Sequence, residues 1–260
     1  MDRDLRERLL EAGVDPQRVT DGRDAWLRLH GRFGPLATLS DRYALEAECR
    51  GVAPQDLPEG DRRRIAREVQ EARYPGMELV GSVGADTIYV ASYDPAWPEH
   101  FADWQQRIFF AVSTAVRIDH VGSTAVPGLA AKPIVDVQVS VPDVADEAPY
   151  LQELGSLGLY LRIREPGHRY LRPPPGEPRA VHVHVCEAGS RWEREHLLFR
   201  DYLRAESAVR DAYTALKLDL AARYRHDRLA YSEAKTGFIL DALDHAQVWA
   251  ERTGWSLAYQ

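Results

Sequence analysis

Two segments of this chain alternate valine with polar residues, and this pattern constrains the fold more than any other feature of the sequence. Valine takes every second position in Ile134-Val-Asp-Val-Gln-Val-Ser-Val141, and again in Val181-His-Val-His-Val185. Successive side chains of a strand point to opposite faces, so a period of two predicts strands with one apolar and one polar face. The intervening polar positions hold Asp136, Gln138, His182 and His184.

These polar residues are chemically active types. If the two strands are neighbours with matching faces, Asp136, His182 and His184 converge. A carboxylate and two imidazoles could bind a divalent metal or move a proton, which makes these three the candidate catalytic and metal-binding residues. A carboxylate in the middle of a strand needs a partner in any case. Hydrogen-bonded histidines of an ordinary half-buried sheet are the alternative.

A glycine-serine turn follows the strand that precedes Asp136. In His120-Val-Gly-Ser-Thr124, Gly122 permits a close backbone approach that a β-carbon would forbid. Ser123 and Thr124 add hydroxyl groups, and exposed amides at such a turn bind anions. Lys132 could supply positive charge to a phosphate. His120 either belongs to this anion site or hydrogen-bonds the turn.

The remaining patterns divide the chain into a helical region, residues 1–77, and an α/β domain, residues 78–260. The first region carries helical spacing over 2–12, over 24–33, after a cap at Thr38 or Ser40, and after a cap at Asp61; Pro75-Gly76 ends it. In the second, strands are predicted over 87–92, 116–121, 133–141, 159–164 and 181–186, and helices over 99–116, 144–157, 193–205, 208–223 and 232–253.

Several of these motifs together resemble the GrpB family. They are Tyr93-Asp-Pro-Ala-Trp97, the long block from His120 to Asp136, His182-Val-His184 and Phe199-Arg-Asp-Tyr-Leu203. The spacing of Gly122-Ser123 and Asp136 is similar to that of the nucleotidyltransferase superfamily. This resemblance implies a nucleotidyltransferase-like mixed sheet with covering helices. It also implies that the turn holds a nucleoside triphosphate and that Asp136 holds magnesium. Lys217 and Lys235 fall at family-like positions, and Lys235 could reach a phosphate.

The chain departs from the superfamily pattern at two places. Gln138 stands where a second carboxylate is expected, and a histidine, His182 or His184, stands where a third would be. Magnesium prefers oxygen ligands, so a one-metal site, a histidine-assisted transfer, or manganese or zinc fits better. We therefore predict a metal-assisted transferase that moves a nucleotidyl or phosphoryl group to a small molecule. The alternatives are a non-catalytic nucleotide- or metabolite-binding module and a tailoring or ligase-type enzyme that uses the two histidines.

Composition excludes other classes. The 260 residues carry a formal charge of −7, which argues against a general nucleic-acid coat. No apolar run reaches the roughly 18 residues of a membrane span, and the N-terminal residues do not form a secretory signal. With two cysteines and no disulfide framework, a cytoplasmic protein is expected. The chain contains no Gly-x4-Gly-Lys-Ser/Thr loop, which argues against kinase activity.

Overall fold

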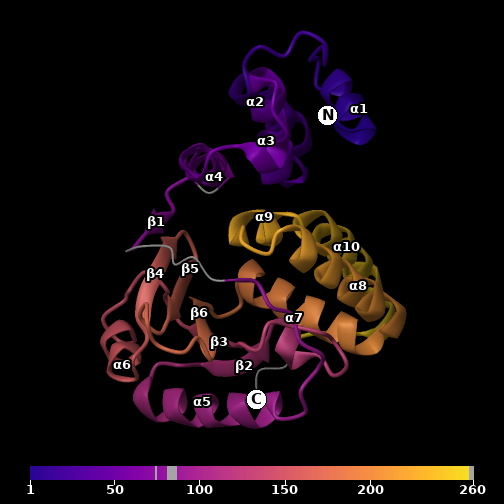
Figure 1. The fold of residues 1–260 in the computed structure, drawn as a ribbon. Coiled ribbons are helices and arrows are strands. Elements are labelled where there is room, and N and C mark those ends of the chain that lie inside the picture. The colour runs from indigo at the N-terminus through magenta and orange to yellow at the C-terminus, as the bar shows by residue number, and fades with distance from the viewer. Residues whose placement is uncertain (74, 81–86, 258–260) are drawn as a thin grey trace. The chain divides into compact units, whose positions relative to one another are not determined.

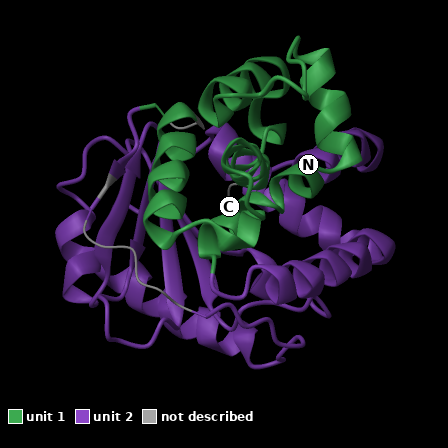
Figure 2. Ribbon diagram, turned by 45° about the horizontal axis from the view of Figure 1, so that its top comes forward, with its two compact units in different colours: residues 1–75, 227–239 green, residues 76–226, 240–260 purple. Residues whose placement is uncertain are grey.

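The computed structural model describes residues 1–73, 75–80 and 87–257. The chain divides into two compact units, shown in Figure 2. The first contains residues 1–75 and 227–239, and the second contains residues 76–226 and 240–260. Within the described part of the chain, no helix is both long enough and apolar enough to cross a membrane.

The first unit is helical (Figure 1). Its elements are α1 (Arg3–Glu11), α2 (Gly22–Phe33), α3 (Leu39–Arg50), α4 (Glu59–Arg73) and α9 (Arg228–Glu233), with short 3-10 turns η1 (Gly34–Leu36) and η2 (Pro54–Asp56). Thr38 caps α3 in a capping box with Asp41, and Gly51 ends it in the left-handed conformation, as predicted. The predicted cap at Asp61 is wrong, because α4 begins at Glu59 and the Asp61 carboxylate pairs with Arg50 instead.

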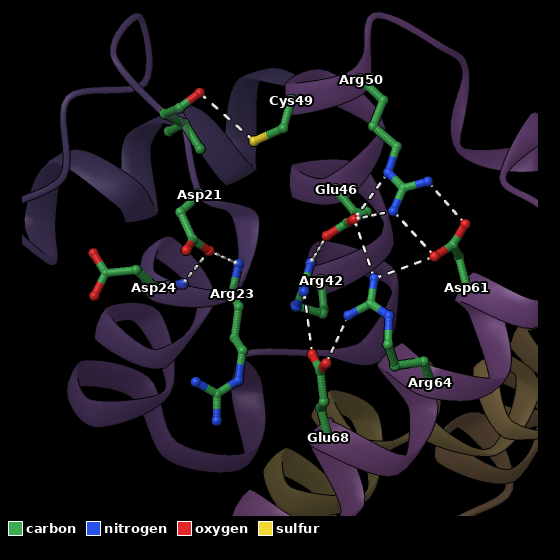
Figure 3. A network of polar contacts seen from close by, with 11 residues as sticks. Asp21, Arg23, Asp24, Arg42, Glu46, Cys49, Arg50, Asp61, Arg64 and Glu68 are labelled. Atoms are coloured by element: carbon green, nitrogen blue, oxygen red, sulfur yellow. Dashed lines mark hydrogen bonds and ion pairs between the residues drawn. The ribbon is translucent and has the colours of Figure 1, made fainter.

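A network of charged side chains joins α3 to α4 (Figure 3). Arg42 lies at its centre and is 1% exposed. Its guanidinium donates to Glu46 at 2.8 Å and to Glu68 at 3.2 Å. Arg64 pairs with the same two carboxylates from a more exposed position. Because a buried charge is stable only when it is paired, Arg42 holds the two carboxylates and the two helices together.

The second unit is built on a six-stranded mixed sheet in the order β1-β4-β5-β6-β3-β2. The strands are β1 (Glu78–Leu79), β2 (Arg117–Val121), β3 (Val135–Val141), β4 (Tyr160–Glu165), β5 (His168–Arg172) and β6 (Val181–Glu187). The central strands β3 and β6 run parallel, and the other neighbours pair antiparallel. This confirms the predicted mixed α/β class.

Helices cover both faces of this sheet. The valines of β3 and β6 pack against residues of and around α5 (Trp97–Ala111) and α6 (Leu151–Ser156), including Ile108, Tyr150 and Leu154. The polar face lies under α7 (Arg191–Ala205), which bonds to both β3 and β2. The helices α8 (Ser207–Arg223) and α10 (Thr236–Thr253) follow.

Some predicted elements differ from the structure. Residues 87–92 form no strand and make only an isolated bridge from Ala91 to Ala131. The helix expected at 99–116 spans 97–111, because Pro98 occupies its first turn, where a missing N–H costs nothing. The helix expected at 144–157 contracts to α6, and the one at 232–253 is split into α9 and α10. Strand β5 was not predicted.

Replacing Arg42 by methionine is expected to lower the free energy of unfolding by about 3–5 kcal/mol, because it leaves two carboxylates without their buried partner. The matched change Arg64→Met removes a guanidinium that is 45% exposed and is expected to cost about 0–1 kcal/mol. Urea unfolding followed by circular dichroism measures both. Equal costs for the two variants would contradict the role assigned to Arg42.

Candidate functional site

The parallel pairing of β3 with β6 brings the predicted residues together. Its register sets Asp136 opposite His182 and Gln138 opposite His184. His182 Nδ1 lies 3.1 Å from Asp136 Oδ1, and His184 Nε2 lies 3.8 Å from the same oxygen. The structure therefore has the convergence that the alternating pattern predicted.

Contact with His182 stabilises the ionised form of Asp136. Burial by itself raises the pKa of this carboxyl group, but its hydrogen bond with His182, together with the nearby His184, holds the pKa well below its usual range. Asp136 is thus a carboxylate at neutral pH, available as an acceptor for donors or cations.

The glycine-serine turn lies directly against this carboxylate. Gly122 has a φ of 68° and precedes a short 3-10 turn, η3 (Ser123–Ala125). A β-carbon on Gly122 would lie 2.2 Å from Asp136 Oδ2. Only glycine fits there, so the predicted close backbone approach is confirmed. Ser123 is half-buried in the turn.

His120 and Thr124 hold the turn from inside. His120 Nε2 lies 3.0 Å from the Thr124 hydroxyl, which donates in turn to the Ile134 carbonyl at 3.4 Å. The His120 ring stacks on Phe101 with centroids 4.7 Å apart. Burial lowers the pKa of His120 to about 4. His120 therefore hydrogen-bonds the turn, which is one of the two roles that the sequence predicted for it.

The lysines lie elsewhere. Lys132 is half-buried in the segment that leads into β3. Lys235 belongs to the first compact unit, where its ammonium lies 4.7 Å from the centre of the Tyr231 ring. Lys217 is buried on α8 beside Tyr213. The structure therefore does not group Lys235 with Asp136 in one unit.

Sequence reasoning missed two arginines of α7. Arg200 donates to the His120 carbonyl at 3.0 Å, and Arg204 donates to the Ala125 carbonyl at 2.9 Å. Both pair with Asp201, and the Arg200–Asp201 contact measures 2.7 Å. Burial and the neighbouring charge of Arg200 lower the pKa of Arg204. Two guanidinium groups therefore place positive charge on the backbone around the turn.

Sequence reasoning also missed a chain of groups behind His184. His168 Nε2 lies 3.0 Å from His184 Nδ1, and His168 Nδ1 lies 2.6 Å from Glu165. Trp192 of α7 stacks on both histidines. The available signal was the Pro166-Gly167 pair, which marks a tight turn between two strands and would have placed Glu165 and His168 side by side.

The donor set does not fit a magnesium ion. Asp136 Oδ1 is engaged by an imidazole, and its neighbour Gln138 supplies only an amide. Another carboxylate on this face, Asp119 of β2, is paired with Arg117. Over residues 1–73, 75–80 and 87–257, no group of three histidine, cysteine or acidic side chains is arranged to hold a metal ion. The chemistry proposed below therefore uses the side chains of the site and not a magnesium ion.

Fold and site together define a mixed α/β protein with a carboxylate-imidazole cluster beside a glycine-serine turn. The chain belongs to the GrpB family, whose model, described as GrpB protein, matches residues 87–245. It is 44% identical over 164 residues to a UPF0157 protein of Streptomyces coelicolor, covering 63% of this chain and 87% of that protein. The crystal structure of the conserved protein GrpB from Enterococcus faecalis is similar, with a TM-score of 0.56 and 32% identity over 62% of this chain and 99% of that one.

A further relative has a different name. A dephospho-CoA kinase of Mycolicibacterium paratuberculosis is 32% identical over 196 residues, which cover 62% of this chain and 46% of that protein. The similarity thus covers less than half of the kinase.

Gly122→Ala tests the close approach at the turn. Its β-carbon would overlap the Asp136 carboxylate in addition to straining the backbone. Gly158→Ala is the matched control, because Gly158 has a φ of 80° and open space around it. The control is expected to cost about 1–2 kcal/mol from strain alone, and Gly122→Ala clearly more. Thermal unfolding compares them, and equal shifts in Tm would show that the overlap is relieved without cost.

Acid is expected to destabilise the protein partly through His120. Its pKa is about 4 in the folded state, so below pH 6.5 the unfolded chain takes up this proton first. Stability falls as the pH drops from 6.5 to 4, by about 2 kcal/mol between pH 7 and pH 5. Urea unfolding of His120→Asn at the two pH values should show a difference smaller by that amount. An unchanged difference would mean that His120 takes up its proton without loss of the fold.

Proposed function

We propose that this protein is a nucleotidyltransferase-like enzyme that transfers a nucleotidyl or phosphoryl group from a nucleoside triphosphate to a small-molecule acceptor. The observation that carries the proposal is the contact between Gly122 and Asp136. A turn with exposed amides suits phosphate oxygens, and here such a turn touches a carboxylate flanked by two imidazoles.

Charge around the turn supports an anionic substrate. Phosphates beside Asp136 need compensating positive charge, and Arg200 and Arg204 hold the carbonyls of the turn residues. Positive groups fixed around a transferring phosphoryl group stabilise the charge that develops on it. In this proposal the amides of Gly122 and Ser123 orient the phosphates, and the Asp136 cluster orients the attacking hydroxyl.

The names of relatives also favour a nucleotide substrate. Proteins called dephospho-CoA kinase contain a segment similar to this chain. The phosphate-binding loop of a kinase is missing from the present sequence. This relationship therefore supports nucleotide binding, whereas the missing loop argues against kinase activity.

One observation favours a second candidate, a non-catalytic nucleotide- or metabolite-binding module. Gln138 occupies the position of the superfamily's second carboxylate and is 0% exposed. Among the residues that the structure describes, its amide has no hydrogen-bond partner. A neutral amide in this place is consistent with a fold that has kept the glycine-serine turn and lost metal-dependent transfer.

Calorimetric titration separates these candidates. ATP, GTP, CTP and UTP are titrated separately into metal-free protein, alone and with magnesium, manganese or zinc. We expect one nucleotide to bind and Asp136→Asn to change its affinity at least tenfold, because this carboxylate touches the turn. Asp103→Asn, on the exposed side of α5, is the matched control and should bind like the unmodified protein.

Each outcome distinguishes one interpretation. Binding followed by release of diphosphate or nucleoside diphosphate when acceptors are added supports the transferase. Binding without turnover across an acceptor library supports the non-catalytic module. Binding of zinc or manganese without any nucleotide would turn attention to the two histidines, and absence of all binding would overturn both candidates.

A further inference from the structure

Four acid-base side chains lie in series and end at Asp136, beside the glycine-serine turn. Glu165 Oε1 lies 2.6 Å from His168 Nδ1, and His168 Nε2 lies 3.0 Å from His184 Nδ1. The other nitrogen of His184, Nε2, lies 3.8 Å from Asp136 Oδ1. The first two contacts are hydrogen bonds, and the third is too long to be one.

The hydrogen-bond partners determine where the protons are. An ionised Glu165 can only accept, so His168 Nδ1 carries a hydrogen. Burial lowers the pKa of His168 to about 4, so its ring is neutral at neutral pH and Nε2 holds a lone pair. His184 must then donate from Nδ1 to form the bond of 3.0 Å.

The last nitrogen of this hydrogen-bonded series, His184 Nε2, faces Asp136. In the tautomer with hydrogen on Nδ1, Nε2 of His184 holds the lone pair. That lone pair faces Asp136 Oδ1, which is also an acceptor, across 3.8 Å. A hydroxyl group between these two atoms can donate to either of them, so the site suits a group that brings its own hydrogen.

The rings are held in this orientation from two sides. Trp192 stacks on His168 with centroids 4.4 Å apart and on His184 at 5.5 Å. Arg169 donates to the Glu165 and His168 carbonyls, which fixes the turn between β4 and β5. A ring flip at His184 would lose the bond to His168, so packing and hydrogen bonding select the same orientation.

We propose that Glu165 and His168 are positioning residues that hold His184 as the Nδ1–H tautomer, so that Nε2 accepts the proton of a hydroxyl group bound beside Asp136. The inference rests on the proposed function only for the identity of this hydroxyl, which is the acceptor's. As its oxygen bonds to phosphorus, the leaving phosphate group departs with the bridging electron pair. The hydroxyl proton moves to His184 Nε2, and Glu165 stabilises the resulting charge through His168.

Nitrogen NMR measures the tautomer directly. The full chain is labelled with ¹⁵N-histidine, and long-range ¹H–¹⁵N spectra are recorded at pH 7.5 without ligand; His184→Gln assigns the signals. We expect a protonated, pyrrole-type Nδ1 and a lone-pair, pyridine-type Nε2. Glu165→Gln should convert this single tautomer into a mixture, because a glutamine amide can donate to or accept from His168. Glu177→Gln changes an exposed carboxylate between β5 and β6, and this control should leave the signals unchanged.

Two results would overturn the inference: hydrogen on His184 Nε2 in the unmodified protein, or an unchanged pure tautomer in a folded Glu165→Gln. Circular dichroism checks that the variant folds. If it does not, His168→Gln gives the same comparison, since it replaces an acceptor set by Glu165 with an amide that can donate or accept. The tautomer is measured without nucleotide, so a failure of nucleotide binding leaves this result intact and overturns the proposed function alone.

Discussion

The parallel pairing of β3 with β6 is the interaction on which the site depends. It sets Asp136 opposite His182 and Gln138 opposite His184, so one strand supplies the carboxylate and the other the imidazoles. The same pairing buries the valines against α5 and α6. A shift of one residue would turn the valines toward α7 and the polar residues toward α5 and α6, so the hydrophobic core and the site are stabilised by one register.

Around this pair, arginine and acid-base side chains come from a helix and from the neighbouring hairpin. Arg200 and Arg204 bring positive charge to the turn from α7, and His168 with Glu165 supports His184 from the neighbouring hairpin. Charge compensation and proton transfer are thus available from side chains. This arrangement agrees with Gln138, since a neutral amide adds no negative charge that a cation would need to balance.

The strand pattern and the turn were predictable from local sequence. Period-two alternation gave the two faces of β3 and β6, and Gly122 was recognised because a close approach forbids a β-carbon. Strand β5 was missed because His168–Arg172 has no clean alternation, and its stability comes from pairing on both sides with β4 and β6. Because β5 was not predicted, His168 and the preceding Glu165 were not recognised as site residues.

The sequence by itself determined which faces are apolar, where the glycine is required and which residue types carry chemistry, because these follow from backbone geometry over a few residues. Only the tertiary structure decided how those residues act together. It engaged His120 with Thr124 inside the turn, put Lys235 in the other compact unit and connected His184 to Glu165. Hydrogen-bond partners set the proton positions of an imidazole, and these partners come from strands and helices distant in the chain.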